Sequence, residues 1–247
     1  MDIEQKNITN SALTNYSRSD PWPDNDPWHS YTRYKEKEII EKWLSNYSAS
    51  WNTVLNAGSG GTEYNIPVKT LIHLDIIEKY IDHFEKYIVG SIEKIPLASK
   101  SLDGIICVGS VLNYADAQRA IAEFARLLRN DGFLILEFER SESAEFLGTR
   151  EYGKDIFPKQ YNYNGQEHLL WLYSEKHILS MLQYYGFYVH KKVRIHTLSS
   201  LINRLGVPEA RASKYARMDS TFHAFSYPLA HNIMLFLTKD VPSESKD

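Results

Sequence analysis

One ten-residue stretch, Val54-Leu55-Asn56-Ala57-Gly58-Ser59-Gly60-Gly61-Thr62-Glu63, limits what this chain of 247 residues can fold into. Val54 and Leu55 favour a buried strand, and the glycines that follow allow positive φ angles and a close approach of the backbone to a ligand. A second apolar strand, 70–74, ends in Asp75. Strand, glycine turn, strand and acid form the layout of a nucleoside-binding α/β unit. In such a unit the ligand lies outside the carboxyl ends of the strands, and the acid binds the ribose hydroxyls.

The glycine turn distinguishes between two kinds of nucleoside cofactor. A dinucleotide site has the pattern G-x-G-x-x-G and opens a long helix whose N-terminus binds the pyrophosphate. Here Glu63 holds the third glycine position, and only residues 62–69, with Pro67 among them, precede the next strand. Proline removes a backbone donor, so a full helix does not fit. S-adenosylmethionine has no phosphate, and its ammonium and sulfonium suit a nearby carboxylate. The sequence therefore favours S-adenosylmethionine, with an ordinary glycine turn as the alternative.

Three further segments follow Asp75 in a fixed order. They are 90–97 (GSIEKIPL), 101–114 (SLDGIICVGSVLNY) and 127–136 (LLRNDGFLIL). The series resembles the class I S-adenosylmethionine-dependent methyltransferases, in the broad small-molecule branch that includes the ubiquinone and menaquinone methyltransferases. The resemblance covers about residues 50–140 and implies a Rossmann-like fold.

The resemblance also implies where the cofactor lies. The glycine turn would lie under the methionine part, Asp75 would hold the ribose hydroxyls, and Ser91 and Ile92 would flank the adenine. The chain departs from the family in two places, because Ser91 stands where an acid is usual and the helix after the glycine turn is shortened. The candidate cofactor-binding residues of the core are Asn56, Ala57, Gly58, Ser59, Gly60, Glu63, Asp75, Ile76, Ser91, Ile92, Gly109, Ser110 and Tyr114.

The segment before the first strand is expected to lie near the cofactor. Residues 1–19 are polar, and we expect them to be irregular. Residues 20–29 contain three prolines and two tryptophans, which favours an extended segment on the body, either a lid over the cofactor or a strap over the core. A helix follows. In the family that the chain resembles this region often closes over the cofactor, so Tyr31, Arg33 and Tyr34 are candidates to touch it, with a solvated helix start as the alternative.

The rest of the chain alternates between helical and strand patterns and then carries long insertions. A short helix is expected at 77–84, helices capped by Asp116 and Ser174 follow, and an excursion at 196–231 includes a helix near 198–205. We therefore expect an α/β fold: a Rossmann-like, doubly wound, seven-stranded and mostly parallel sheet with an N-terminal lid segment and insertions late in the chain. The later strands are expected at 87–89, 102–108, 133–138, 187–195 and 232–237.

Composition and charge argue against several other classes. Apolar residues make up 43% and charged residues 24%, which is ordinary for a soluble globular protein. A net charge of −3 gives no general attraction to nucleic acid or anionic membranes. No apolar run reaches the length of a membrane span and the first residues contain no signal-peptide core, so we expect a cytoplasmic protein. The histidines and acids lack metal-ligand spacing, and we expect no metal.

No residue is conspicuous as a catalytic group. Methyl transfer from a sulfonium is an in-line displacement, and alignment alone can supply roughly 7–11 kcal/mol of its barrier. If the acceptor is a hydroxyl or an acidic carbon, a base helps, and His196, His223 and His231 lie in the late excursion. Each of them is alternatively a surface or packing histidine. Tyr114 is a candidate to orient the acceptor, with core packing as the alternative.

The chain divides into three parts of one structural domain. They are a tail, lid segment and first helix (1–49), a cofactor-binding core (50–140), and substrate-cap elements with the last sheet strands (141–247). We expect an S-adenosylmethionine-dependent methyltransferase (EC 2.1.1.-) that acts on a small molecule and releases S-adenosyl-L-homocysteine, with a homodimer as one option. The alternatives are an RNA or protein methyltransferase and a non-catalytic binding module. The Asn113-Tyr114 pair is not the Asn-Pro-Pro-Tyr run of enzymes that methylate nucleic-acid amino groups, so nucleic acid is not an expected partner.

Overall fold

The computed structural model describes residues 2–18, 26–46, 51–163, 166–219 and 229–239. Within these residues the protein is built on a seven-stranded sheet of order β3-β2-β1-β4-β5-β9-β8, beside a separate β6-β7 hairpin. Strands β1 to β5 are parallel, whereas β9 is antiparallel to both of its neighbours. This confirms the expected Rossmann-like, mostly parallel sheet. The strand bounds are β1 Trp51–Ala57, β2 Val68–Asp75, β3 Tyr87–Val89, β4 Leu102–Cys107, β5 Leu128–Glu139, β6 Ile156–Tyr163, β7 Gln166–Tyr173, β8 Phe187–Ile195 and β9 Asn232–Lys239.

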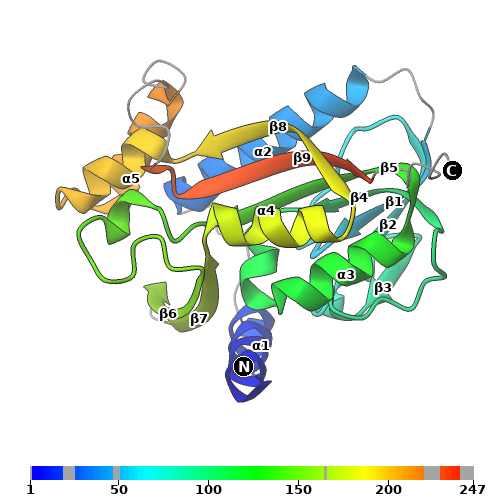
Figure 1. Cartoon of the computed structure of the whole chain (residues 1–247), viewed down its shortest axis with the longest axis horizontal. Coiled ribbons are helices and arrows are strands. Elements are labelled where there is room, and N and C mark those ends of the chain that lie inside the picture. The colour runs from blue at the N-terminus through cyan, green and yellow to red at the C-terminus, as the bar shows by residue number, and fades with distance from the viewer. Residues whose placement is uncertain (1, 19–25, 47–50, 164–165, 220–228, 240–247) are drawn as a thin grey trace, which may run out of the picture.

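Helices cover both faces of the sheet, as Figure 1 shows. The helices α3 (Ala117–Leu127) and α4 (Glu175–Tyr184) pack on one face, and α2 (Pro27–Ser45) packs on the other. Asp116 and Ser174 cap α3 and α4 by accepting hydrogen bonds from backbone N–H groups, as the sequence predicts. Because both faces are buried, the central strands are almost continuously apolar.

The sequence predicts a shortened helix after the glycine turn. In the described structure the segment between β1 and β2 contains no helix at all. The helix expected at 77–84 is likewise reduced to a single 3₁₀ turn, η1 (Glu78–Tyr80). Helix α2 covers the face that a helix after β1 would cover. Its Ile40 and Leu44 are fully buried in a cluster with Tyr64 and Ile66 of the β1–β2 connection.

The N-terminal residues correct the sequence-based expectation of an irregular segment. They form a 17-residue helix, α1 (Asp2–Arg18), whose Ile8 and Ala12 are buried. The helix is docked by polar contacts, because Gln5 donates to the carbonyl of Tyr114 at 3.0 Å and accepts from the indole N–H of Trp171 at 2.7 Å. The sequence lacks the apolar pattern of an amphipathic helix here, because half of the residues on the buried side of α1 are polar and form hydrogen bonds.

The start of α2 is a second correction. The sequence predicts an extended segment through residue 29, but the helix begins at Pro27. Asp26 caps it by accepting from the backbone N–H groups of Trp28 at 2.9 Å and His29 at 3.1 Å. Proline suits the first helical position because its missing N–H is not needed there. The remainder of the expected extended segment, residues 20–25, lies outside the described residues.

The late insertions lie beyond the carboxyl ends of the parallel strands. They include α5 (Thr197–Arg204), α6 (Glu209–Ala212) and the 3₁₀ turns η3 (Ala144–Phe146) and η4 (Ser213–Met218), in addition to the β6-β7 hairpin. Residues 164–165, between the two strands of this hairpin, lie outside the described residues. Among the helices that the structure describes, none is long and apolar enough to cross a membrane.

The sheet contains one glycine whose substitution tests the packing between strands. Gly104 of β4 pairs with Phe133 of β5, and a Cβ added at Gly104 would lie 2.1 Å from the Phe133 ring. We expect Gly104→Ala to lower the free energy of unfolding by about 1–3 kcal/mol, because the buried ring has to leave its position. Urea unfolding measures the change. Gly90→Ala is the control, since nothing lies within 4 Å of its added Cβ. Equal stability of the two variants would contradict this packing.

Candidate functional site

A pocket lies at the carboxyl ends of β1, β2 and β4, where a doubly wound sheet binds ligands. The sheet side of the pocket comes from four strand ends and the loops that follow them. Its remaining walls come from α1, α2, the 3₁₀ turns that contain Tyr80 and Tyr114, the end of β5 and the start of β9. The residues of these strand ends and loops are Gly58, Gly60, Leu74, Asp75, Ile76, Ile77, Gly90, Ser91, Ile92, Val108, Gly109, Ser110 and Val111. The other walls are formed by Thr9, Ala12, Tyr16, Trp28, His29, Thr32, Tyr80, Tyr114, Ala115, Glu139, His231 and Asn232.

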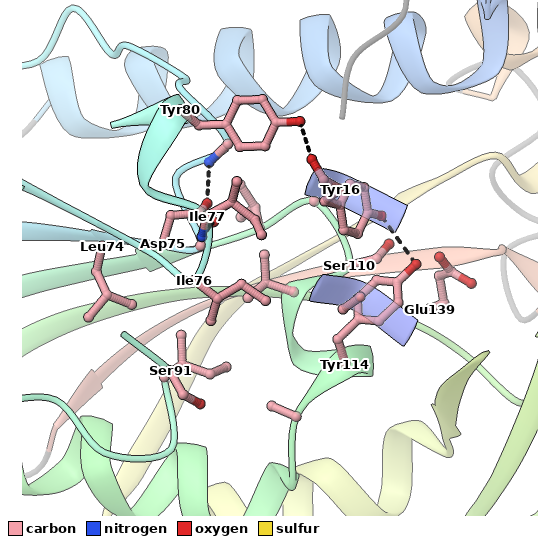
Figure 2. Close-up of a pocket in the computed structure, with 18 of the residues that line it drawn as sticks. Tyr16, Leu74, Asp75, Ile76, Ile77, Tyr80, Ser91, Ser110, Tyr114 and Glu139 are labelled. Carbon is pink, nitrogen blue, oxygen red and sulfur yellow. Dashed lines mark hydrogen bonds between the residues drawn. The ribbon is translucent and has the colours of Figure 1, made fainter. Parts of the chain in front are cut away.

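Asp75 connects the loops at one end of this pocket (Figure 2). Its carboxylate accepts hydrogen bonds from the backbone N–H groups of Gly60 at 2.8 Å and Ile77 at 2.9 Å. The carbonyl of Leu74 accepts from the N–H groups of Gly58 and Ser59. Burial raises the pKa of Asp75, while the backbone donors lower it. The end of β2 therefore fixes the glycine turn and presents a buried carboxyl group to the pocket.

The glycine turn also packs closely against the loop that follows β4. Gly58 has a φ of 75°, and a Cβ at this position would lie 2.3 Å from a methyl carbon of Val111. On the other side of that contact, Gly109 and Ser110 both have positive φ angles. Because Ser110 is not glycine, its left-handed backbone needs support from its surroundings.

That support comes from a buried glutamate which sequence reasoning missed. Glu137 of β5 accepts from the N–H of Ser110 at 2.6 Å and from the side-chain amide of Asn232 at 2.6 Å. Burial raises the pKa of Glu137 to about 7. Burial and the charge of Glu137 raise the pKa of Glu36 on α2 well above its usual value. The sequence does contain a signal for this role, because Glu137 is an acidic residue inside the otherwise apolar run of β5.

Tyr16 of α1 and two tyrosines beneath this helix, Tyr80 and Tyr114, form the outer wall. Tyr16 donates its hydroxyl hydrogen bond to the Tyr114 hydroxyl at 3.2 Å, and the hydroxyl of Tyr80 donates to the Tyr16 carbonyl at 2.6 Å. Tyr16 is partly buried, and this burial raises its pKa to about 12. Helix α1 is thus fixed across the pocket from both sides. Sequence reasoning identified Tyr114 but missed Tyr16, because it treated residues 1–19 as irregular.

The predicted cofactor residues of the core fall into two groups. Asn56, Ala57 and Ser59 lie behind the pocket: Ala57 is fully buried, the amide of Asn56 donates to Ser59 Oγ, and that hydroxyl lies 2.8 Å from Nδ1 of His73. They shape the turn from beneath. The predicted residues that line the pocket are Gly58, Gly60, Asp75, Ile76, Ser91, Ile92, Gly109, Ser110 and Tyr114.

Four further predicted contacts also lie outside the pocket lining. The Tyr31 hydroxyl donates to the carbonyl of Ala216, Tyr34 is 67% exposed, and Arg33 also lies outside the lining. The helix starts earlier than expected, so its pocket-facing residues are Trp28, His29 and Thr32 instead. Glu63 is exposed. The β1–β2 connection carries it away from the pocket, and its carbonyl accepts from the Lys37 ammonium at 2.6 Å.

The three candidate histidines have different positions. His196 is fully buried outside the lining: its ring stacks on Trp28 at 3.8 Å, and its nitrogens lie 2.8 Å from Thr32 Oγ1 and 2.8 Å from Ser199 Oγ. Burial holds its pKa well below the usual value, which suits a packing histidine. His223 lies outside the described residues. His231 lines the pocket.

Two carboxylates flank His231. Its Nε2 lies 3.5 Å from an oxygen of Glu139, and its Nδ1 lies 3.2 Å from an oxygen of Glu145. Burial lowers the pKa of His231, but the hydrogen bond to Glu145 and the charges of the two glutamates outweigh it and raise the pKa to about 9. His231 is therefore a cation at neutral pH and does not fit the role of general base that the sequence suggested for it.

Comparisons with known proteins identify the core of the chain. Residues 55–136 match the methyltransferase domain family. The ubiquinone/menaquinone biosynthesis C-methyltransferase of Campylobacter jejuni is 36% identical over 76 residues, which is 30% of this chain. The matched segment spans 32% of that relative, so the chain corresponds to about a third of its length.

Solved structures extend the likeness to most of the fold. A Listeria monocytogenes protein assigned to the S-adenosylmethionine-dependent methyltransferases aligns over 86% of this chain and 100% of its own, with a TM-score of 0.61 at 13% identity. The Burkholderia thailandensis 1,6-didemethyltoxoflavin N1-methyltransferase, solved with S-adenosylhomocysteine, aligns over 85% of this chain and 79% of its own, with a TM-score of 0.53 at 14% identity. The expected resemblance to class I S-adenosylmethionine-dependent methyltransferases is confirmed.

The pKa of His231 leads to a prediction for stability. Its folded pKa of about 9 lies above its usual value of 6.5, so the stabilisation is complete below pH 6.5 and is lost as the pH rises through 9. We expect His231→Gln to be less stable than the wild type by on the order of 3 kcal/mol at pH 6.5, and the difference to shrink by pH 9.5. Urea unfolding at both pH values measures this. His83→Gln, at a half-exposed position, serves as the control. A pH-independent difference would refute the ion-pair assignment.

Proposed function

We propose that this chain, whose core resembles the class I S-adenosylmethionine-dependent methyltransferases in sequence and in fold, transfers the methyl group of that cofactor to a small-molecule acceptor by in-line displacement. The observation that carries the proposal is the buried carboxyl group of Asp75, which ends β2 and lines one pocket together with the glycine turn and Ser91. This is the place where such a sheet holds a ribose.

The residues around Asp75 fit an adenosyl group. Asp75 offers acceptors for the ribose hydroxyls, and the bare backbone at Gly58 leaves room where a side chain would collide with Val111. Ser91 and the apolar Ile92 would flank the adenine. When bound, S-adenosylmethionine supplies a methyl group on a positively charged sulfur. The chain itself contributes alignment and the exclusion of water, which a displacement of this kind needs most.

The position of helix α1 supports a small acceptor. Helix α1 lies across it, and the hydrogen bonds of Tyr16 to Tyr80 and Tyr114 hold the helix in place. A nucleic-acid or protein acceptor would have to displace α1 to reach the cofactor, whereas a small molecule fits beneath it. The net charge of −3 also gives no attraction to RNA. The expected cytoplasmic location, the homodimer and the three-part division of the chain stay predictions.

Calorimetry tests the proposal directly. We expect S-adenosylmethionine and S-adenosylhomocysteine both to bind with a 1:1 stoichiometry, because the two share the groups that Asp75, Ser91 and Ile92 would contact. NAD serves as the control, since the structure offers no helix N-terminus after β1 for its pyrophosphate. Binding of NAD without either methyltransferase ligand would show that the proposal has the wrong cofactor.

Substitution of Asp75 tests the residue that carries the proposal. We expect Asp75→Ala to weaken binding of S-adenosylhomocysteine by tenfold or more, because each hydrogen bond to a charged group contributes about 1.5–3 kcal/mol. Asp75→Asn keeps one acceptor oxygen for the loop. We expect this variant to lose affinity for S-adenosylhomocysteine as well, and its circular dichroism spectrum to show that it stays folded. Asp82→Ala is the matched control, since Asp82 is exposed in the same connection. Unchanged affinity in both Asp75 variants would exclude this carboxylate as the ribose contact.

A further inference from the structure

The end of the pocket opposite Asp75 and Ser91 contains a group of charged residues that an adenosyl group does not need. Figure 2 shows Glu139 on this side, beside Ser110 and Tyr114. Glu139 is the last residue of β5 and lines the pocket, as does His231. Its side chain is 13% exposed, so it reaches the pocket from an otherwise buried position.

The backbone of Glu139 is fixed by a single buried side chain. Asn113, which is fully buried in η2 (Val111–Tyr114), accepts from the N–H of Glu139 at 2.9 Å and donates to its carbonyl at 3.1 Å. The same amide donates to the carbonyl of Trp171 at 2.7 Å. The position of Glu139 therefore depends on the loop after β4, which also lines the pocket.

The side chain of Glu139 has one fixed partner. Within the described residues its only ion-pair or hydrogen-bond partner is His231, at 3.5 Å from one carboxylate oxygen. His231 is held in turn by Glu145, whose carboxylate also accepts from the Tyr161 hydroxyl at 2.8 Å. Burial raises the pKa of Glu145, but the hydrogen bond and charge of His231 lower it overall. The second oxygen of Glu139 is left for a molecule in the pocket.

The charges of this cluster limit the kind of acceptor. Two carboxylates, Glu139 and Glu145, and one imidazolium, His231, give a net charge of −1. Further charged groups that act on this cluster are Glu209 on α6 and Lys159 on β6, and His29 lies 2.6 Å from Asp26 at the start of α2. A carboxylate or phosphate on the acceptor would be repelled at this end, whereas an uncharged or cationic acceptor would not.

We propose that Glu139 is the catalytic carboxylate of the acceptor site, which takes the proton from an uncharged or cationic acceptor whose nucleophile is an O–H or N–H group. His231 is then a positioning residue, held between Glu139 and Glu145, and not the base. This inference rests on the proposed function, because it needs the cofactor's methyl group to face this end of the pocket.

The groups named above account for every bond and for the proton in this methyl transfer. The lone pair of the acceptor oxygen or nitrogen forms a bond to the methyl carbon, and the bond from that carbon to sulfur breaks. The bonding pair goes to sulfur, which becomes a neutral thioether. The proton that leaves the acceptor goes to the free oxygen of Glu139, and no oxidant or metal is consumed.

A cofactor analogue tests the assignment without knowledge of the acceptor. In sinefungin, a carbon that bears an ammonium group replaces the sulfur and its methyl group, so the ammonium lies where the methyl would be transferred. S-adenosylhomocysteine has no charge at that atom. We expect Glu139→Gln to weaken sinefungin about tenfold by calorimetry, while the affinity for S-adenosylhomocysteine stays within twofold. Glu167→Gln is the matched control, since Glu167 is exposed on β7.

A second variant tests whether His231 acts at the ligand through its charge beside Glu139 or only by packing. His231→Gln removes the cation beside Glu139, so we expect sinefungin to bind at least twofold more tightly relative to S-adenosylhomocysteine. A role in packing alone would weaken both ligands or leave their ratio unchanged. Glu139→Asp keeps the negative charge, so we expect it to retain most of the preference for sinefungin over S-adenosylhomocysteine. This variant shows whether an effect of Glu139→Gln comes from the lost charge or from a failure to fold.

The outcomes separate this inference from the function on which it rests. If the wild type binds neither ligand, the proposed function fails. If S-adenosylhomocysteine binds normally and the ratio of the two affinities is the same in the wild type and in Glu139→Gln, only the role of Glu139 is overturned.

Discussion

The site depends on the hydrogen bonds that Asp75 accepts at the end of β2. One carboxyl group holds the N–H of Gly60 in the glycine turn and the N–H of Ile77 in the next connection. Because the same turn packs against Val111, the loops after β1, β2 and β4 form one rigid unit. A usual helix after β1 would stabilise this turn from its other side. Here that helix is missing, and α2 from the N-terminal region packs on that face instead. The carboxylate that would bind the cofactor is therefore also the group that keeps the cofactor loop in place.

Buried polar side chains provide the second set of restraints. Glu137 supports the left-handed backbone of Ser110, and Asn113 fixes Glu139 by its backbone. Asn232, the first residue of β9, donates to Glu137, so the antiparallel strand takes part in the site. A carboxylate is costly inside a protein unless hydrogen bonds satisfy it, and the N–H of Ser110 and the amide of Asn232 do this for Glu137. The walls of the pocket are thus set by hydrogen bonds from the sheet interior as well as by packing.

The sheet could be predicted from the sequence because its signals are local. Apolar strands, the glycine turn, the terminal Asp75 and the caps Asp116 and Ser174 each act within a few residues. The walls of the pocket depend on contacts distant in sequence. Gln5 of α1 pairs with Trp171, 166 residues away, and nothing near Gln5 indicates this. A shift of three residues in the start of α2 replaced Tyr31 and Tyr34 by Trp28 and Thr32 at the pocket. The role of Glu139 likewise depends on His231 and Glu145, which the chain brings together only after folding.

The stacking of His196 on Trp28 couples two regions of the chain whose sequences could otherwise change independently. Trp28 and Thr32 are part of the pocket wall, and His196 and Ser199 belong to the insert that carries α5. In related folds, such an insert is the region that evolution changes when an enzyme adopts a new acceptor. Here any change that moves α5 also moves the helix that forms a wall of the pocket. Divergence in acceptor preference within this lineage should therefore be accompanied by compensating changes at the start of α2, and the two segments should be exchanged together when chimeric enzymes are built.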